Sequence, residues 1–402
     1  MTLTLLFDLD DTLLGNPIET FLPEYTRGLS LRLKTIVEPQ LMVPQLMSAT
    51  KAMVKNLNPC LTLNNVFDDA FYPALNIRRQ DVQPDLDRFY AQDFPALKRL
   101  TRRFPDAIKA VDAALQGGYQ VAVATNPLFP KTAVLQRLAW AGLPADEYPW
   151  LRVPCFEDFH FAKPHAEFFS ELLGQIGWPD GPVIVVGNDV ENDIQPARQL
   201  GLASFWVQDS PLRQAVPGSP RHVSGRLSDL VEWLKQTPPE ALTPEISGRQ
   251  ALLACLRATP AALLYLMDAL AETAWKTKPS PREWCLAEIA CHLRDVEAEV
   301  NLPRIETVLV KSNPFIAGKN TDVWAAERKY IEQDGRQALL DFIQQRLKLV
   351  NVLSGVAEAD WNLPARHAIF GPIQLQELVS ITASHDRLHL QTVHQLTKNP
   401  VG

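Results

Sequence analysis

Phe7-Asp8-Leu9-Asp10-Asp11-Thr12-Leu13 is the stretch that decides the fold, because it places two aspartates directly after a short apolar run. That run, residues 3–7, has the length and composition of a fully buried strand. Side chains two positions apart on an extended segment point the same way, so Asp8 and Asp10 can face one small volume. Close carboxylates raise each other's pKa unless a cation neutralises them, and oxygen ligands favour a hard cation such as Mg²⁺. The alternative is an acidic turn that caps the next helix.

Further apolar runs predict more buried strands in the first half of the chain. They cover residues 119–125, 182–187 and 203–207, with a weaker candidate at 150–153. Helical patterns separate them, so we expect an α/β fold with a doubly wound parallel sheet. In such sheets the ligand site lies beyond the carboxyl ends of the strands, where Asp8, Thr125 and Asp189 all fall. The sequence therefore predicts a site at that edge of the sheet.

A long helical segment interrupts this alternation. Residues from about 15 to 95 show helical periodicity without a convincing strand. We expect a helical insertion placed directly after the first acidic stretch.

A polar, proline-rich stretch at residues 237–247 predicts a linker between a first domain, residues 1–236, and a second domain, residues 248–402. Beyond the linker no strand is persuasive. Helical patterns at about 248–272, 283–311, 334–355 and 374–397 predict an all-α four-helix bundle.

Three histidines stand out in the second domain. His385 and His389 lie four positions apart and share one helix face, and His292 lies on an otherwise apolar face of the second predicted helix. Three imidazoles from two packed helices suit an open site for Zn²⁺ or Ni²⁺. The alternative is a set of hydrogen-bonded histidines without a metal.

Composition narrows the classes of partner. The net charge of -7 argues against a general nucleic-acid binder, because affinity for phosphate backbones comes from Lys and Arg. No apolar run is expected to reach the length of a bilayer span, and no export signal is visible, which indicates a cytoplasmic protein without a membrane partner. The five cysteines are scattered without a C-x-x-C pair and indicate reduced thiols. The sequence makes no prediction about the oligomeric state.

Four motifs, taken in order, resemble the haloacid dehalogenase (HAD) superfamily over residues 1–236. They are the D-x-D-x-T stretch, Thr125 at the end of a strand, Lys163 before a proline, and the acidic cluster 188–193. The resemblance implies that Asp8 attacks phosphorus and forms an aspartyl-phosphate, while Asp10 acts as general acid and then as general base. Dehalogenating relatives lack the second aspartate, so phosphate transfer is favoured over dehalogenation.

The same resemblance implies roles for the other motifs. Thr125 and Asn126 would bind the phosphoryl group, and Lys163 would offset its charge. Mg²⁺ would be held by Asp8, the backbone carbonyl of Asp10 and an acid of the last motif. Asp189 is favoured as the direct ligand, with Asp193 in support, although Asn188 occupies the position where relatives carry an aspartate. The helical insertion resembles the cap of phosphoglycolate-phosphatase-type enzymes, which points to a small phosphorylated metabolite as the substrate.

The second half resembles the DinB/YfiT-like bundle family over about residues 248–398. The resemblance rests on Trp284 followed by residues 288–293, on residues 370–372 and on residues 385–391. The family's metal triad maps onto His292, His385 and His389, whereas His367 and His394 fall outside it. Some members are thiol-dependent transferases.

Three hypotheses for function follow. The first is a Mg²⁺-dependent phosphatase that acts on a small phosphorylated metabolite, fused to a metal-binding bundle. The alternative makes the bundle the active module, a metal-dependent thiol transferase or hydrolase, with the HAD-like half regulatory. The third is a binding protein that senses ligands without turnover. The complete set of HAD motifs favours the first hypothesis over the third.

Overall fold

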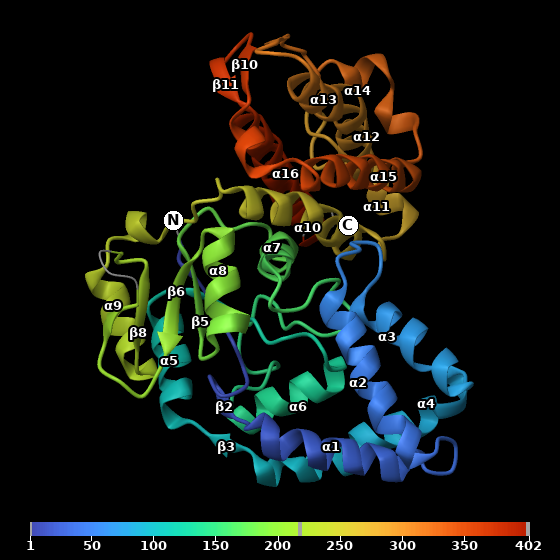
Figure 1. Cartoon of the computed structure of the whole chain (residues 1–402), viewed down its shortest axis with the longest axis vertical. Coiled ribbons are helices and arrows are strands. Elements are labelled where there is room, and N and C mark those ends of the chain that lie inside the picture. The colour runs from blue at the N-terminus through green and yellow to red at the C-terminus, as the bar shows by residue number, and fades with distance from the viewer. Residues whose placement is uncertain (1, 216–218, 399–402) are drawn as a thin grey trace. The chain divides into compact units, whose positions relative to one another are not determined.

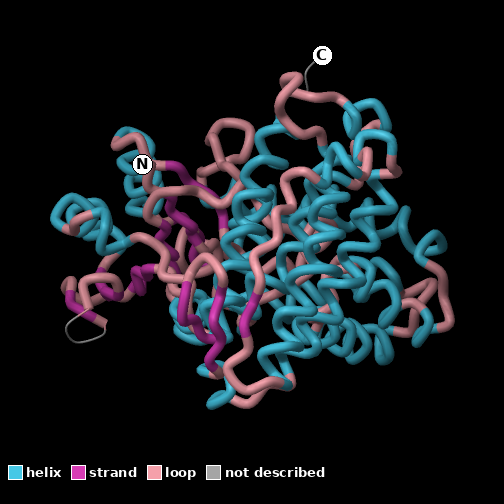
Figure 2. Tube along the Cα trace, turned by 90° about the horizontal axis from the view of Figure 1, so that it is seen from above, coloured by secondary structure: helices cyan, strands magenta, loops and turns pink. Residues whose placement is uncertain are grey.

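The computed structural model describes residues 2–215 and 219–398. The chain divides into two compact units, residues 1–172 with 179–245, and residues 246–402 with 173–178. Each unit is described by itself, and Figure 1 gives the element labels. Figure 2 shows that strands, in magenta, are a minority of a mainly helical trace.

A six-stranded sheet forms the centre of the first unit, in the order β4-β1-β5-β6-β8-β7. All neighbouring strands are parallel except β7, which pairs antiparallel with β8. β1 lies between β4 and β5, so every residue of its sequence Thr-Leu-Leu-Phe is buried. The strands are β1 (Thr4–Phe7), β4 (Gln120–Val123), β5 (Val183–Gly187), β6 (Ala203–Val207), β7 (Arg213–Gln214) and β8 (His222–Gly225).

Helices cover both faces of this sheet. In Figure 1, α5 and α9 lie on one side of the strands, and α7 and α8 lie on the other. The predicted doubly wound parallel sheet is therefore confirmed. These helices are α5 (Pro105–Gln116), α6 (Lys131–Ala141), α7 (Ala166–Gln175), α8 (Gln195–Leu200) and α9 (Leu230–Gln236).

The weaker strand candidate at 150–153 is wrong. This segment makes two backbone hydrogen bonds with β4, from Leu151 N to Val121 O and from Arg152 O to Val123 N, both 2.9 Å. It then turns away before a regular ladder forms. The predicted linker also differs from an open connector, because Leu242 is fully buried in the core of the first unit.

The cap, defined here as residues 18–100, joins the core through two short strands that lie side by side. β2 (Leu14–Gly15) pairs antiparallel with β3 (Arg102–Arg103), so the chain enters and leaves the cap at neighbouring points. Between these strands the chain is helical, with α1 (Ile18–Leu33), α2 (Pro39–Lys55), α3 (Leu63–Phe71), α4 (Arg79–Arg88), η2 (Phe89–Asp93) and η3 (Phe94–Leu100). α3 begins at a capping box, in which Thr62 and Asn65 bond each other's backbone.

Four long helical segments form the second unit, as the sequence predicted. α10 packs against α15 and α16, and α12 packs against α15. The second segment is continuous, because the π-helical turn η7 joins α12 to α13. The segments are α10 (Arg249–Met267), α12–η7–α13 (Leu286–Val296, Glu297–Asn301 and Leu302–Val310), α15 (Gly335–Ser354) and α16 (Leu375–Lys398).

Smaller elements complete the second unit. A three-stranded sheet in the order β11-β10-β9 was missed from the sequence. These strands are β9 (Phe315–Ile316), β10 (Pro364–His367) and β11 (Gly371–Gln374), and two short helices accompany them, α11 (Glu272–Lys276) and α14 (Trp324–Glu327).

One helix of the described chain, α10, is long and apolar enough to cross a membrane by length and composition alone. Its most apolar window has a mean hydropathy of 1.4, so the expectation that no apolar run reaches this length was wrong. However, 67% of that window is buried inside the structure. The core helix of a globular unit passes the same test of length and composition.

Candidate functional site

Asp8 is the first side chain beyond the carboxyl end of β1, and it is buried. Lys163 Nζ lies 2.8 Å from Asp8 Oδ1 and 2.5 Å from Asp193 Oδ1. All three residues are buried. The structure thus brings together residues from three of the four sequence motifs, which are far apart in the chain.

Burial and charge set the acidity of this cluster. Burial raises the pKa of Asp8 to about 7; the ammonium of Lys163 lowers it, and Asp193 and Asp10 raise it. Burial alone would lower the pKa of Lys163, but the two carboxylates outweigh burial and raise it. Lys163 is therefore a firmly charged ammonium between two acids.

Asp10 is held by two residues that the sequence motifs did not single out. Arg137 Nη1 lies 2.5 Å from Asp10 Oδ2, and Asn16 Nδ2 donates to Asp10 Oδ1 over 2.8 Å. Arg137 comes from α6 and is 1% exposed, while the Asp10 carboxylate is 36% exposed. The arginine holds one oxygen of this carboxylate, which stays partly exposed to solvent. No local signal marks Arg137, because its partner lies 127 positions away in the sequence.

The loop after β5 carries two aspartates, Asp189 and Asp193, whose side chains make different contacts. Asp193 points back to Lys163 and also accepts a hydrogen bond from the backbone of Asp189, 3.0 Å away. A Cβ at Gly187 would lie 2.2 Å from Asp193 Oδ2, so only glycine fits where Asp193 approaches the strand end. Asp193 is therefore held in a buried position beside Lys163.

Asp189 is more exposed and caps the next helical turn. Its carboxylate accepts hydrogen bonds from the backbone of Glu191 and from the backbone and side chain of Asn192, at 2.8–3.0 Å. Burial alone would raise the pKa of Asp189, but these hydrogen bonds lower it. Asn188 Oδ1 accepts from the Thr12 hydroxyl at 2.9 Å. Both candidate ligands therefore carry oxygen atoms at the edge of the site.

Thr125 and Asn126 follow β4, next to the strand that carries Asp8. Thr125 is buried. The Asn126 side chain bonds the backbone of Lys163, accepting from its N at 3.2 Å and donating to its O at 3.4 Å. Asn126 therefore orients the segment that carries Lys163, which the sequence analysis did not anticipate.

The donor set of this site suits a hard divalent cation. Asp8, Asp10, Asp189 and Asp193 bring four carboxylates to this end of the sheet, while Lys163 and Arg137 are the cations bonded to them. The excess of carboxyl groups over cations and the all-oxygen donor chemistry fit Mg²⁺. Among the described residues, no three of these acids bring their ligand atoms as close together as the histidines of the second unit do, and the Asp189 carboxylate caps the following helical turn.

The three predicted histidines meet in the second unit. Their ligand atoms all lie within 4.8 Å of one another. Nε2 of His385 lies 3.1 Å from Nε2 of both His292 and His389. Trp284 packs against this group, with its ring centroid 4.8 Å from that of His292. Three Nε2 atoms directed at one another from two helices match the ligand arrangement of an open metal site.

Electrostatics favour neutral imidazoles at this cluster. Burial, followed by His385, lowers the pKa of His292 to about 4. Burial also lowers the pKa of His385 and of His389, the latter well below its usual range. The buried Nδ1 of His292 has no hydrogen-bond partner among the described residues. Neutral rings offer lone pairs to a metal, so the residues present fit Zn²⁺ or Ni²⁺.

A buried ion-pair triad stands beside the histidines. Arg346 on α15 bonds Glu297 on η7 and Asp386 on α16, and all three are almost fully buried. Asp386 is the immediate neighbour of His385, and Thr259 on α10 donates to it over 3.0 Å. This triad fixes α16 against two other segments of the bundle. Sequence reasoning missed it, because nothing local pairs these charges.

Comparisons with known proteins agree with both resemblances. Residues 2–201 match the family of haloacid dehalogenase-like hydrolases, and residues 256–393 match the DinB superfamily.

Two phosphatases are similar to part of the first unit. Glyceraldehyde 3-phosphate phosphatase from Methanocaldococcus jannaschii is 32% identical over 109 residues, which cover 27% of this chain and 45% of that protein. Phosphoglycolate phosphatase from Agrobacterium fabrum is 31% identical over 144 residues, covering 34% of this chain and 58% of that protein. The chain thus spans about half the length of each relative.

A solved structure is similar to the second unit. YfiT from Bacillus subtilis, described as a probable metal-dependent hydrolase with an unusual four-helix bundle topology, is 15% identical, with a TM-score of 0.36. The match covers 41% of this chain and 93% of YfiT. From the family matches, residues 2–201 of the chain belong to the haloacid dehalogenase-like hydrolases, and residues 256–393 belong to the DinB superfamily.

Proposed function

We propose that the first unit is a Mg²⁺-dependent phosphatase that hydrolyses a small phosphorylated metabolite through an aspartyl-phosphate on Asp8. The observation that carries this proposal is the buried Asp8 carboxylate, bonded to Lys163 at the end of the central strand. The family match and the printed names of the two phosphatase relatives support the reaction class.

The chain's own residues divide the reaction between them. Asp8 attacks phosphorus, and Lys163 stabilises the negative charge that gathers on the phosphoryl oxygens. Asp10 protonates the departing alkoxide and later takes a proton from the water that releases phosphate. Arg137 keeps the Asp10 carboxylate in place for both steps. Thr125 binds the phosphoryl group, and Asn126 contributes to its binding while fixing the Lys163 segment.

Asp8, the Asp10 carbonyl and Asp189 would hold Mg²⁺, with Asp193 in support and Asn188 as the alternative to Asp189. When bound, Mg²⁺ would supply positive charge that offsets the negative charge of the phosphate.

Hydrolysis of 4-nitrophenyl phosphate by the full chain in Mg²⁺ tests the proposal. Asp8→Asn should reduce release of nitrophenol to the background rate, because an amide does not attack phosphorus. Asp106→Asn, an exposed acid on α5, is the matched control and should retain the wild-type rate. Equal rates for wild type and Asp8→Asn would rule out the phosphatase.

The histidine cluster favours a second candidate, a metal-dependent hydrolase or thiol transferase in the bundle, with the HAD-like half regulatory. We infer that His292, His385 and His389 hold one Zn²⁺ or Ni²⁺ ion, supported by their converging Nε2 atoms. A metal with an open position activates a water or a thiol.

Elemental analysis of tag-free protein tests the metal site. It should give close to one transition metal per chain, lost in His385→Ala and kept in His367→Ala, whose ring lies outside the cluster. Retention of the metal by His385→Ala would contradict the triad.

We also propose that the functional boundaries are residues 1–236, 237–247 and 248–402, with the cap at residues 18–100, in a cytoplasmic protein that needs neither nucleic acid nor membrane. Independent folding and activity of residues 1–247 would support these boundaries. Aggregation of that fragment would oppose them.

A further inference from the structure

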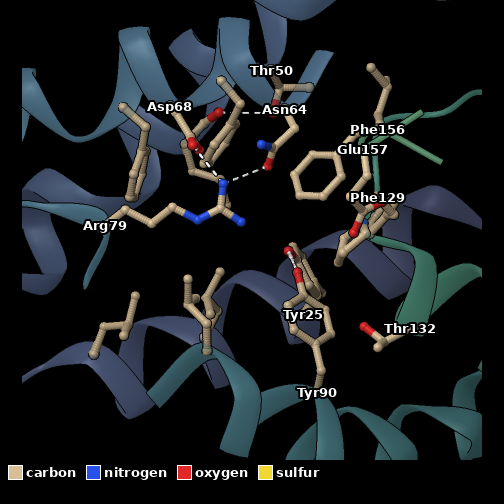
Figure 3. Close-up of a pocket in the computed structure, with 18 of the residues that line it drawn as sticks. Tyr25, Thr50, Asn64, Asp68, Arg79, Tyr90, Phe129, Thr132, Phe156 and Glu157 are labelled. Atoms are coloured by element: carbon tan, nitrogen blue, oxygen red, sulfur yellow. Dashed lines mark hydrogen bonds and ion pairs between the residues drawn. The ribbon is translucent and has the colours of Figure 1, made fainter. Parts of the chain in front are cut away.

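The cap contains a cavity that the proposed mechanism does not use. Its volume is about 310 Å³, and it is lined by α1, α2, α3 and α4 together with residues 128–132 and 156–157. This volume is at the lower end of the range for small-molecule sites, roughly 300–1,000 Å³. Figure 3 shows the lining side chains arranged around an open centre.

Aromatic and aliphatic side chains supply most of the wall. Tyr25 and Tyr90 lie on one side and share a hydrogen bond between their hydroxyls, 2.9 Å apart, while Phe129 and Phe156 lie on another (Figure 3). Burial raises the pKa of Tyr25 to about 12, so its hydroxyl stays neutral. Ring faces and aliphatic chains favour an apolar ligand, above all one that contains a ring.

The charged side chains disfavour an anionic ligand. Four charged residues line the cavity, one arginine and three acids, namely Arg79, Asp68, Asp87 and Glu157. The arginine is already neutralised, because Arg79 Nη1 lies 2.6 Å from Asp68 Oδ2 and 2.9 Å from Asn64 Oδ1. A carboxylate entering this cavity would meet more negative than positive charge.

One donor remains available for an uncharged oxygen. The Arg79 guanidinium points into the cavity from the side opposite Phe129 and Phe156 (Figure 3). Its Nε donates to Gln83, and among the described residues Nη2 has no hydrogen-bond partner. A ketone, ether or hydroxyl oxygen on a mainly apolar ligand would satisfy Nη2.

One residue of the cavity wall, Phe129, is linked through Arg137 to the candidate general acid. The Phe129 ring packs against Tyr25 at 5.3 Å between centroids, and the Arg137 guanidinium lies 4.5 Å from the centroid of the same ring. That guanidinium bonds Asp10. Phe129 and Arg137 therefore connect the cavity wall to Asp10, which in the proposed mechanism protonates the oxygen of the leaving alcohol.

We propose that the cavity binds the leaving group of the phosphatase substrate, and that this group is an uncharged, mainly apolar alcohol of about the size of a bicyclic ring. This inference rests on the proposed phosphatase. It sets the chain apart from enzymes for short, carboxylate-bearing phosphate esters.

Three alkyl phosphates test this assignment with the full chain in Mg²⁺: 2-(2-naphthyl)ethyl phosphate, ethyl phosphate and phosphoglycolate. Their leaving groups are all alkoxides, so differences in kcat/KM report mainly on binding of the alcohol. We expect the naphthylethyl ester to exceed both others by at least about tenfold, as a filled apolar pocket contributes on this scale. A preference for phosphoglycolate would overturn the proposal.

A variant that fills the cavity tests whether the preference for the naphthylethyl ester arises there. Thr50 on α2 lines the cavity and is half-buried, so Thr50→Phe should reduce the naphthylethyl preference by about tenfold or more. Ser48→Phe adds the same ring on an exposed part of the same helix and should keep the wild-type preference. If Thr50→Phe does not fold, Met47→Trp narrows the cavity from a position that is 43% exposed. An unchanged preference in a folded cavity variant would overturn the proposal.

Binding of the free alcohol separates this inference from the phosphatase itself. Fluorescence of 2-(2-naphthyl)ethanol should report binding to wild type and to Ser48→Phe, and weaker binding to Thr50→Phe. Turnover of the esters without binding of the alcohol would remove the cavity assignment and leave the phosphatase standing. Binding without turnover of any ester would remove the phosphatase, and with it the leaving-group role, while supporting the ligand class of the cavity.

Discussion

Arg137 Nη1 and Asp10 Oδ2 lie 2.5 Å apart, and this pair joins the loop after β1, which carries Asp8 and Asp10, to helix α6. The arginine is buried and the carboxylate is partly open, so the arginine fixes the acid without closing access to it.

Replacing this arginine should slow proton transfer. Arg137→Met should lower kcat for ethyl phosphate by about 100-fold, the order of one misplaced general acid. The loss should be smaller for 4-nitrophenyl phosphate, whose leaving group needs little protonation. Steady-state kinetics on both esters measure the difference. Arg27→Met, which removes an exposed ion pair with Glu24, is the control and should change neither rate. Equal losses on both esters would contradict a role for Arg137 in positioning Asp10.

Removing Lys163 should destabilise the first unit. Lys163→Met leaves Asp8 and Asp193 buried without their cation, which should cost about 3–5 kcal/mol of unfolding free energy in the absence of divalent metal. Urea unfolding in EDTA measures this cost. The double variant Lys163→Met/Asp193→Asn should recover part of it, because one buried charge is gone. Lys109→Met, in an exposed pair with Asp106, should have no measurable effect, and a similar loss there would refute the explanation.

The triad beside the histidines should behave in the same way in the second unit. Arg346→Met leaves Glu297 and Asp386 buried and unpaired, and should cost about 3–5 kcal/mol. The triple variant Arg346→Met/Glu297→Leu/Asp386→Leu should be more stable than the single one, since no buried charge remains. Urea unfolding followed by circular dichroism compares them. The exposed Arg366→Met on β10 serves as control. A triple variant less stable than Arg346→Met would contradict this account.

Stability of the first unit should fall in mild acid through His222. Burial, followed by Arg198 and Arg221, lowers the pKa of His222 to about 4. An unfolded histidine has a pKa near 6.5. Between that pH and about 4, His222 is protonated in the unfolded chain but neutral in the folded chain, so protonation favours unfolding. The free energy of unfolding is therefore unaffected by protonation of His222 above pH 6.5 and decreases as the pH falls from 6.5 towards 4.

His222→Gln checks this sign, because it removes the titration and keeps a side chain that can bond Ser204, as His222 Nδ1 does at 3.0 Å. Between pH 7 and pH 5 wild type should lose about 1 kcal/mol more than the variant, after allowance for the partial solvent exposure of the ring. Parallel pH slopes in urea unfolding would show that His222 does not titrate in this way.

Much of the fold could be predicted from sequence because its main elements carry strong local patterns. β1 and β5 are unbroken apolar runs, and the four bundle segments are long and periodic. Short strands were not predicted from the sequence. β8 reads His-Val-Ser-Gly and carries no run of its own, and it becomes a strand because β6 and β7 pair with it on both sides. The sheet of the second unit depends likewise on pairing partners far apart in the sequence.

The candidate site divides in a similar way. Asp8, Lys163 and the three histidines were found because their motifs or spacings are local. Arg137 and Arg346 were missed because each acts through a carboxylate about 40 or more positions away, and an isolated arginine in a helix gives no sign of such a partner. The roles of the site residues themselves stay predictions for the variants above.

The pairing of Leu14 with Arg103 and of Gly15 with Arg102 has a consequence for how such a chain can be rebuilt. Since both crossings sit side by side, the helices between them form an excisable module, and a turn of a few residues could close the gap. Substrate preference could then be exchanged by transplanting that module alone, while the strands that carry the nucleophile keep their register.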